Sequence, residues 1–462
     1  MRMDDWTPTL SLDDRPRYVA IADAISADIK SGRLSAADRL PPQRQLARKL
    51  GMDFTTVARG YGEAQKRGLI ESRVGQGTFV RGQRQEIARR SVWQAGQVDF
   101  SMNLPPEPDD PQLVARMRAG LVEIGANLVD AMRYQGFGGS VSDKEAATNW
   151  LGRRALVPTH DRLFVTPGAH PALLAIFTTL AKPGDTLLAE GLTYPGVRAL
   201  AAQLGVNLVG LPMDEEGIDV DALTQACMQL APKALYLNPT LQNPTTLTVS
   251  EPRRMAIAAV ARRFQLPIVE DDAYGFLPMQ GPRPFAALAP ELTWHISGLA
   301  KCLGAGLRLA YVIAPDARAS WPFVAVARAA NVMASPLTLA LATRWIEDGT
   351  ADAILSFIRS ETRARQKLVA EILPPGSYQA DPCGFHIWLK LPPQWSCSAF
   401  IGHTRATGIG IVSSHPFTVE GPPPEAVRVC LGGPSQRATV RSALEFIAHS
   451  LEEEPALASA FL

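Results

Sequence analysis

The sequence lacks the features that mark several specialised classes of protein. Its 462 residues contain no apolar run that approaches the roughly 20 residues a membrane-spanning helix requires. The first five residues, Met1–Asp5, are acidic and lack an apolar core, so we expect neither a signal peptide nor a membrane partner. Only five cysteines occur, none forms a Cys-x-x-Cys pair, and the histidines show no metal-ligand spacing. We therefore predict a protein of the reduced cytoplasm that has no disulfide framework and no metal site.

Internal repeats and low-complexity tracts are also missing, and the composition is that of a globular protein with two or three domains. The net charge of +1 conceals an asymmetry along the chain. Residues 1–92 hold 17 Lys+Arg against 11 Asp+Glu, whereas residues 93–462 hold 29 against 34. The basic first part suggests a polyanionic partner, although the same excess also fits an ordinary solvated surface.

Apolar spacing in the first 80 residues predicts three helices and a hairpin. Helical intervals separate the apolar side chains from Tyr18 to Ile29, and a second helix is expected over residues 43–50. Asp53 is expected to cap a third helix over residues 54–67. Two β-prone runs follow, with Gly75-Gln76-Gly77 as the tip between them. Helix, turn, helix and hairpin in this order are typical of a winged helix-turn-helix.

Four short motifs in this region resemble the signature of GntR-type winged-helix repressors. They are Leu40-Pro41-Pro42-Gln43-Arg44-Gln45-Leu46-Ala47, Thr55-Thr56-Val57, Gly68-Leu69-Ile70 and Gly75-Gln76-Gly77-Thr78-Phe79-Val80. The resemblance implies a double-stranded DNA operator as partner.

The same resemblance implies a role for each matched residue. Arg44 is expected to meet phosphates, Thr55 and Thr56 to start the recognition helix, and the wing glycines to approach the minor groove. Phe54 and Ala58 stand where many relatives carry arginine, which leaves the base-reading residues open. The alternative is that such residues only cap and solvate helix ends. The predicted DNA-binding set is Arg44, Phe54, Thr55, Thr56, Arg59, Arg73, Gly75, Gln76 and Gly77.

Residues 82–99 carry several charges and show no clear period, so we interpret them as a linker. The predicted domains are therefore residues 1–81, a winged helix-turn-helix, and residues 100–462, a second and larger domain.

From about residue 100, helical and β-prone segments alternate. Short β-prone runs lie near residues 163–165, 186–188, 234–237, 267–269 and 294–296, with helical stretches between most of them. This alternation predicts an α/β fold with a mostly parallel sheet, in which ligands gather at the carboxyl ends of the strands.

Polar and glycine-rich motifs follow these strands. They are Thr166-Pro167-Gly168-Ala169-His170, Asn238-Pro239 with Asn243-Pro244, Asp271-Asp272-Ala273-Tyr274, and Lys301 seven residues before Arg308. A glycine turn at a helix N-terminus presents free N–H groups to an anion, although an ordinary helix cap would look the same.

This order of motifs resembles the fold-type I pyridoxal-phosphate enzymes, the aminotransferase superfamily, over most of residues 100–450. The resemblance implies that Lys301 forms the Schiff base with pyridoxal 5'-phosphate and that Asp271 holds the proton of the pyridine nitrogen. Arg428 matches the arginine that grips a substrate carboxylate. The other implied contacts are Asn243 and Tyr274 at the phenolic oxygen, Tyr194 on the ring, Gly168, Ala169, His170, Ser297 and Arg308 at the phosphate, and Tyr134 at the phosphate of a partner subunit.

The phosphate-binding positions depart from the usual pattern. Gly298 and Ala300 stand where relatives carry hydroxyl side chains, Ser297 is one place out of register, and Ala169 offers no hydroxyl. We therefore expect weaker phosphate binding, or greater use of backbone groups.

A GntR-type reader joined to an aminotransferase-like domain resembles the MocR subfamily of bacterial regulators. The resemblance implies a homodimer in which an amine or amino-acid effector reacts with the cofactor on Lys301 and alters operator binding. One alternative is a working aminotransferase with an accessory DNA-binding arm. Another is a DNA-binding protein whose large domain has lost the cofactor and serves only for dimerisation.

Overall fold

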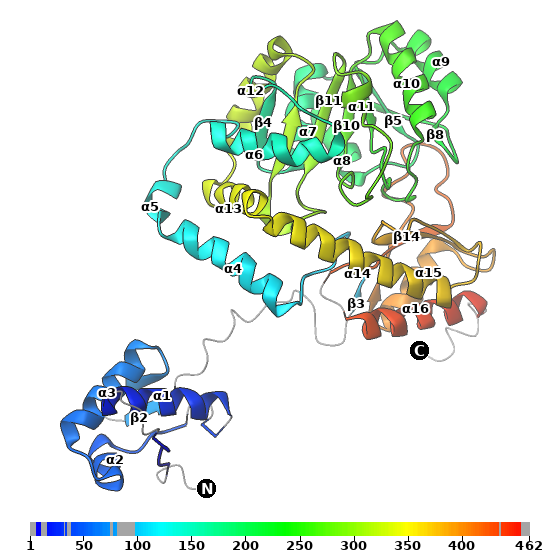
Figure 1. The fold of residues 1–462 in the computed structure, drawn as a ribbon. Coiled ribbons are helices and arrows are strands. Elements are labelled where there is room, and N and C mark those ends of the chain that lie inside the picture. Colours follow the sequence, from blue (N-terminus) through cyan, green and yellow to red (C-terminus); the bar gives the residue numbers. More distant parts are fainter. Residues whose placement is uncertain are drawn as a thin grey trace. The chain divides into compact units, whose positions relative to one another are not determined.

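A computed structural model describes most of the chain, which divides into two compact units, Met1–Gln94 and Ala95–Leu462 (Figure 1). The described residues are 6–10, 16–31, 33–34, 38–73, 77–80, 98–433 and 436–453. The division falls inside the predicted linker, most of which lies outside the described residues together with Gly75 and Gln76. Among the helices of the described part, none has both the length and the apolar character needed to cross a membrane.

The first unit has the winged helix-turn-helix fold that its apolar spacing predicts. Its elements are α1 (Arg17–Lys30), α2 (Gln43–Leu50), α3 (Phe54–Lys66) and an antiparallel hairpin of β1 (Ile70–Arg73) and β2 (Gly77–Val80). Gly51 ends α2 in the left-handed region, and the Asp53 side chain accepts a hydrogen bond of 2.8 Å from the Thr56 amide to begin α3. A Cβ on Gly60 would lie 2.9 Å from Cβ of Ile21, so a small residue here lets α1 and α3 pack closely.

A seven-stranded sheet forms the centre of the second unit. Its order is β4 (Leu163–Thr166), β12 (Ala310–Ile313), β11 (Thr293–Gly298), β10 (Ile268–Asp271), β9 (Ala234–Leu237), β5 (Thr186–Glu190) and β6 (Asn207–Leu211). Only the two pairings that β12 makes are antiparallel, so the sheet is mostly parallel, as predicted.

Helices cover both faces of this sheet, because successive strand residues point to opposite sides. Leu187 joins the core under α7 (Ala169–Leu180), whereas the next residue, Leu188, joins the core under α10 (Glu251–Phe264). The other flanking helices are α6 (Val141–Leu151), α8 (Pro195–Leu204), α9 (Val220–Leu230), α11 (Phe285–Leu288) and α12 (Ala317–Asn331). Farther from the sheet, α4 (Pro111–Gly125), α5 (Leu128–Ala131) and α13 (Pro336–Glu347) contact one another.

A smaller sheet near the C-terminus packs against α14 (Thr350–Ile372), α15 (Cys397–Ala406) and α16 (Arg437–Glu452). Its strands, in order, are β13 (Tyr378–Ala380), β14 (His386–Lys390), β17 (Ala426–Cys430) and β16 (Val412–Ser413). Beside it, β3 (Val98–Asp99) pairs with β15 (Ile409–Gly410). Val98 and Asp99 therefore belong to the second unit, whereas the sequence interpretation had placed them in the linker.

Candidate functional site

A cavity of about 360 Å³ lies where the sheet strands end. It brings together residues from segments that are far apart in the chain. The sequence-predicted residues that line it are Gly168, Ala169, His170, Tyr194, Asn243, Asp271, Tyr274, Lys301, Arg308 and Arg428.

One end of the cavity is suited to an anion. Gly168 precedes α7 with a φ of 111° and provides no side-chain cap, so the first amides of the helix keep their hydrogen-bonding capacity. A Cβ built on Gly168 would lie 3.5 Å from a terminal nitrogen of Arg308, which places the guanidinium beside the helix N-terminus. Helix amides and a guanidinium together favour a phosphate group.

Asp271 ends strand β10 and is buried in the cavity wall. Its Oδ2 accepts a hydrogen bond of 3.0 Å from the Tyr236 hydroxyl, and Asn238 Nδ2 donates to its backbone oxygen at 2.6 Å. Its Oδ1 is buried and has no hydrogen-bond partner among the described residues. Burial raises the pKa of Asp271 to about 6, with the Tyr236 hydrogen bond acting in the opposite direction. This oxygen is therefore available to hold a proton donor of a ligand.

Lys301 follows strand β11 in a tight turn. Its Nζ donates a hydrogen bond to the backbone oxygen of Asn103, in the segment after β3. Burial lowers the pKa of Lys301 to about 8, because an ammonium ion is poorly solvated here. An amine with such a pKa is partly neutral near neutral pH and can act as a nucleophile.

Arg428 reaches the cavity from strand β17 of the smaller sheet. It donates hydrogen bonds to Oδ1 of Asn243 at 2.7 Å and to the backbone oxygen of Ser101 at 2.6 Å. Its Nε is buried and has no partner within the described part of the chain. The guanidinium is thus held in place and keeps N–H groups for a further acceptor, such as a carboxylate.

Tyr194 is held against the cavity by the start of α8. A Cβ on Gly196 would lie 2.3 Å from Cε1 of the Tyr194 ring, so glycine is required for the ring to lie over this turn. This contact gives a physical reason for the glycine two residues after Tyr194.

Two predicted residues lie outside the cavity lining. Ser297 is fully buried, and its hydroxyl has no partner among the described residues. The next residue, Gly298, lines the cavity instead, since neighbouring strand residues face opposite sides. The prediction that Ser297 contributes to the phosphate end of the cavity is corrected accordingly. Tyr134 is 87% exposed, so it is available to another molecule but does not contribute to the cavity of its own chain.

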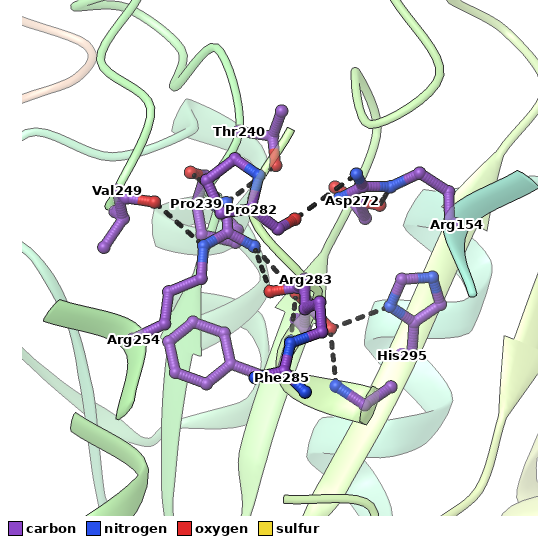
Figure 2. A network of polar contacts seen from close by, with 12 residues as sticks. Arg154, Pro239, Thr240, Val249, Arg254, Asp272, Pro282, Arg283, Phe285 and His295 are labelled. Atoms are coloured by element: carbon purple, nitrogen blue, oxygen red, sulfur yellow. Dashed lines mark hydrogen bonds and ion pairs between the residues drawn. The ribbon is translucent and has the colours of Figure 1, made fainter. Parts of the chain in front are cut away.

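A buried network of charges lies next to the site (Figure 2). Asp272 accepts a hydrogen bond of 3.1 Å from Arg154 Nε, and Glu270 contacts His295 Nδ1 at 2.8 Å and Arg254 at 3.6 Å. Glu270 also accepts hydrogen bonds from two backbone amides at the start of α11. Because buried charges must be compensated, these contacts fix both neighbours of Asp271 and thereby its orientation.

The first unit presents its predicted DNA-binding residues on α2 and α3. Arg44, Thr55 and Arg59 are exposed, and Phe54 is 47% exposed with the Arg44 guanidinium 5.8 Å from its ring centroid. The Thr55 and Thr56 hydroxyls both donate to Asp53, so in the free protein they serve the helix cap. Gly77 begins β2, Arg73 ends β1, and Gly75 and Gln76 lie outside the described residues.

Three residues of the site received no role from the sequence: Asn103, Tyr236 and Asn238. Asn238 directly follows strand β9, and its position in the Asn-Pro motif was a usable signal. Tyr236 looked like an ordinary strand residue. Asn103 lies 198 positions before Lys301, and no local pattern connects the two.

Comparison with known proteins divides the chain in the same way. Residues 95–447 match the family "Aminotransferase class I and II", and residues 17–80 match "Bacterial regulatory proteins, gntR family". In the described part of the chain, no group of three or more His, Cys, Asp or Glu residues is placed to hold a metal ion.

Two curated relatives match over most of this chain. The HTH-type transcriptional regulator YdeF of Bacillus subtilis is 27% identical over 97% of this chain and 97% of its own length. The vitamin B6 salvage pathway transcriptional repressor PtsJ of Salmonella typhimurium is 26% identical over 82% of this chain and 86% of its own. Among solved structures, the α-aminoadipate aminotransferase LysN of Thermus thermophilus, complexed with N-(5'-phosphopyridoxyl)-L-leucine, aligns with a TM-score of 0.70. At 21% identity, over 87% of this chain and all of the other, this likeness establishes the fold.

Proposed function

Because the chain belongs to the aminotransferase class I and II family and carries a gntR-type reader before that domain, we propose that it is a MocR-type transcription regulator whose DNA binding responds to an amine or amino acid. Pyridoxal 5'-phosphate is the cofactor of the second unit. The observation that carries the proposal is one cavity that holds a partly neutral lysine, a buried carboxylate oxygen without a partner and an anion-binding helix end.

The residues fit this cofactor at each of its functional groups. When bound, the cofactor supplies an aldehyde that reacts reversibly with amines and a ring that withdraws electrons. Lys301 would provide the amine, and Asp271 Oδ1 would hold the proton at the ring nitrogen. Tyr274 and Asn243 lie in the cavity wall, where they would bind the ring oxygen, and Tyr194, in the same wall, would cover the ring.

Arg308 and the first amides of α7, at Ala169 and His170, would hold the phosphate. Gly298 and Ala300 line the same cavity and contribute no hydroxyl, so backbone groups and one guanidinium take the place of side-chain hydroxyls.

Arg428 orients the effector. Its guanidinium is fixed by Asn243 and Ser101 and attracts a carboxylate, which directs the amine of an amino acid towards Lys301. An effector then changes DNA binding only if it stabilises one arrangement of the two units over another.

The site is completed by a second copy of the chain. Tyr134 is exposed, and several apolar side chains near it in the chain, on α4, on α5 and in the segments after α5, are also exposed. These are Leu121, Val122, Val129, Met132 and Val141, each at least 56% exposed. An apolar surface of this kind favours a partner, and a dimer also places two readers on paired half-sites. Sedimentation of the wild type and of Val129→Glu tests whether the chain forms a dimer through this surface. A monomeric wild type would contradict the proposed dimer.

The absorbance spectrum of the purified chain with pyridoxal 5'-phosphate tests the cofactor site, with Lys301→Ala as the matched variant. We expect an absorbance band in the wild type that Lys301→Ala lacks and that one added amine perturbs. The affinity for duplex DNA should change at the same concentration of this amine. Absence of the band in the wild type contradicts the proposal. Steady turnover of amine and keto acid without any effect on DNA binding identifies an aminotransferase instead.

A further inference from the structure

Asn103 lines the cavity, although no sequence motif points to it. It is 8% exposed and belongs to the segment that connects β3 to α4. Its side-chain Nδ2 donates a hydrogen bond of 2.8 Å to the Tyr274 hydroxyl, whereas its backbone oxygen accepts from Lys301 Nζ. One residue therefore contacts both the lysine and the tyrosine of the site, through different atoms.

The contact with Tyr274 determines where the tyrosine's own proton can go. A phenolic hydroxyl has one proton to donate and accepts hydrogen bonds through its oxygen. Because Asn103 Nδ2 already donates to that oxygen, the Tyr274 proton is directed to another acceptor. The ring itself is held by aromatic contacts, with centroids 6.0 Å from Phe385 and 5.7 Å from His386. Burial raises the pKa of Tyr274, so the hydroxyl keeps its proton.

We propose that Asn103 is a positioning residue that orients the Tyr274 hydroxyl to donate its proton to the ring oxygen of the bound cofactor. The inference deepens the proposed function and rests on it, since the acceptor is a group of the cofactor. Asn103 acts through Tyr274 and does not itself bind the ring.

The orientation of Tyr274 should affect a measurable quantity, the pKa of the proton on Lys301 Nζ when the cofactor is bound. A hydrogen bond donated to the ring oxygen reduces the negative charge on that oxygen. The oxygen then attracts the neighbouring proton on Lys301 Nζ less strongly. Correct orientation of Tyr274 therefore lowers the pKa of that proton. Loss of the orienting amide raises the pKa, by about half a unit to one unit if one neutral hydrogen bond is weakened.

The experiment is a pH titration of the bound cofactor's absorbance in the full chain, for wild type, Asn103→Ala, Tyr274→Phe and the double variant. Asn103→Ala suits the purpose because it keeps the backbone oxygen that accepts from Lys301. We expect both single variants to raise the midpoint, and Asn103→Ala to add nothing in the Tyr274→Phe background. Glu107→Ala, in the same segment but exposed and not among the residues that line the cavity, serves as the control for truncation of a side chain and should leave the midpoint in place.

Two results would overturn the inference while leaving the proposed function intact. The first is a midpoint that Asn103→Ala leaves unchanged. The second is a shift of equal size in the presence and absence of the Tyr274 hydroxyl, because Asn103 would then act by another route. A wild-type protein without any cofactor band would instead refute the proposed function itself. If Asn103→Ala fails to fold, Asn103→Ser, which retains a small polar side chain but cannot place an amide at Tyr274, replaces it in the same cycle.

Discussion

The Tyr236 hydroxyl donates a 3.0 Å hydrogen bond to Oδ2 of Asp271, while the other carboxylate oxygen remains without a partner among the described residues. Tyr236 and Asp271 lie on neighbouring strands, β9 and β10, which pair in parallel. One side of the carboxylate is therefore fixed by the protein, and the other is left for a ligand.

Asp271→Asn should weaken binding of pyridoxal 5'-phosphate by about tenfold to a hundredfold, because a charge-assisted hydrogen bond to the ring nitrogen is lost. Tyr236→Phe is the matched control: it keeps the carboxylate and should cost only a few-fold in affinity. Titration of the cofactor by absorbance measures both. Equal affinity of Asp271→Asn and wild type would show that this carboxylate does not meet the ring.

The rate at which the cofactor attaches should rise with pH up to about 8 and then level off. The pKa of Lys301 is about 8, and only its neutral form is nucleophilic, so each unit below that pH reduces the reactive fraction about tenfold. Stopped-flow absorbance at several pH values gives this profile. A rate that keeps rising towards pH 10.5, the ordinary value for lysine, would contradict the effect of burial.

Gly298→Ser should strengthen cofactor binding by up to about tenfold, since it supplies a hydroxyl that the phosphate end lacks. The change fits the available space, because a Cβ at this position would lie 3.7 Å from Cβ of Ala169, an ordinary contact. Gly298→Ala controls for the added carbon alone. Equal affinities for the serine and alanine variants would mean that the phosphate lies away from Gly298.

Arg44→Ala should weaken binding to mixed-sequence duplex DNA and reduce the slope of log affinity against log salt by about 0.9, the value for one phosphate contact. Arg67→Ala is the control, because the Arg67 guanidinium is already paired with Asp23 at 2.5 Å and with Glu63 at 2.9 Å. This variant should leave the slope nearly unchanged. Fluorescence anisotropy over a series of salt concentrations measures both variants. An unchanged slope for Arg44→Ala would assign Arg44 to a solvated surface.

Local patterns in the sequence determined the secondary structure and the order of the motifs. Period and capping predicted α1, α2 and α3 within a few residues, since Gly51 and Asp53 act on their immediate neighbours. The polar residues after the strands could likewise be predicted to meet, because parallel strands end at one edge of a sheet. Lys301 and Asp271 stand at such strand ends, and the resemblance to the aminotransferase superfamily supplied their expected roles.

Only the tertiary structure decided which neighbours the residues of the site have. Packing of the segment after β3 brings Asn103 to Lys301 and Tyr274, and no periodicity encodes a contact across such a separation. The alternation of side chains in β11 turns Gly298 towards the cavity and Ser297 away from it. Burial, which exists only in the folded chain, lowers the pKa of Lys301 and raises that of Asp271. The sequence thus determined which chemical groups are present, and the fold determined their neighbours, their solvation and therefore their reactivity.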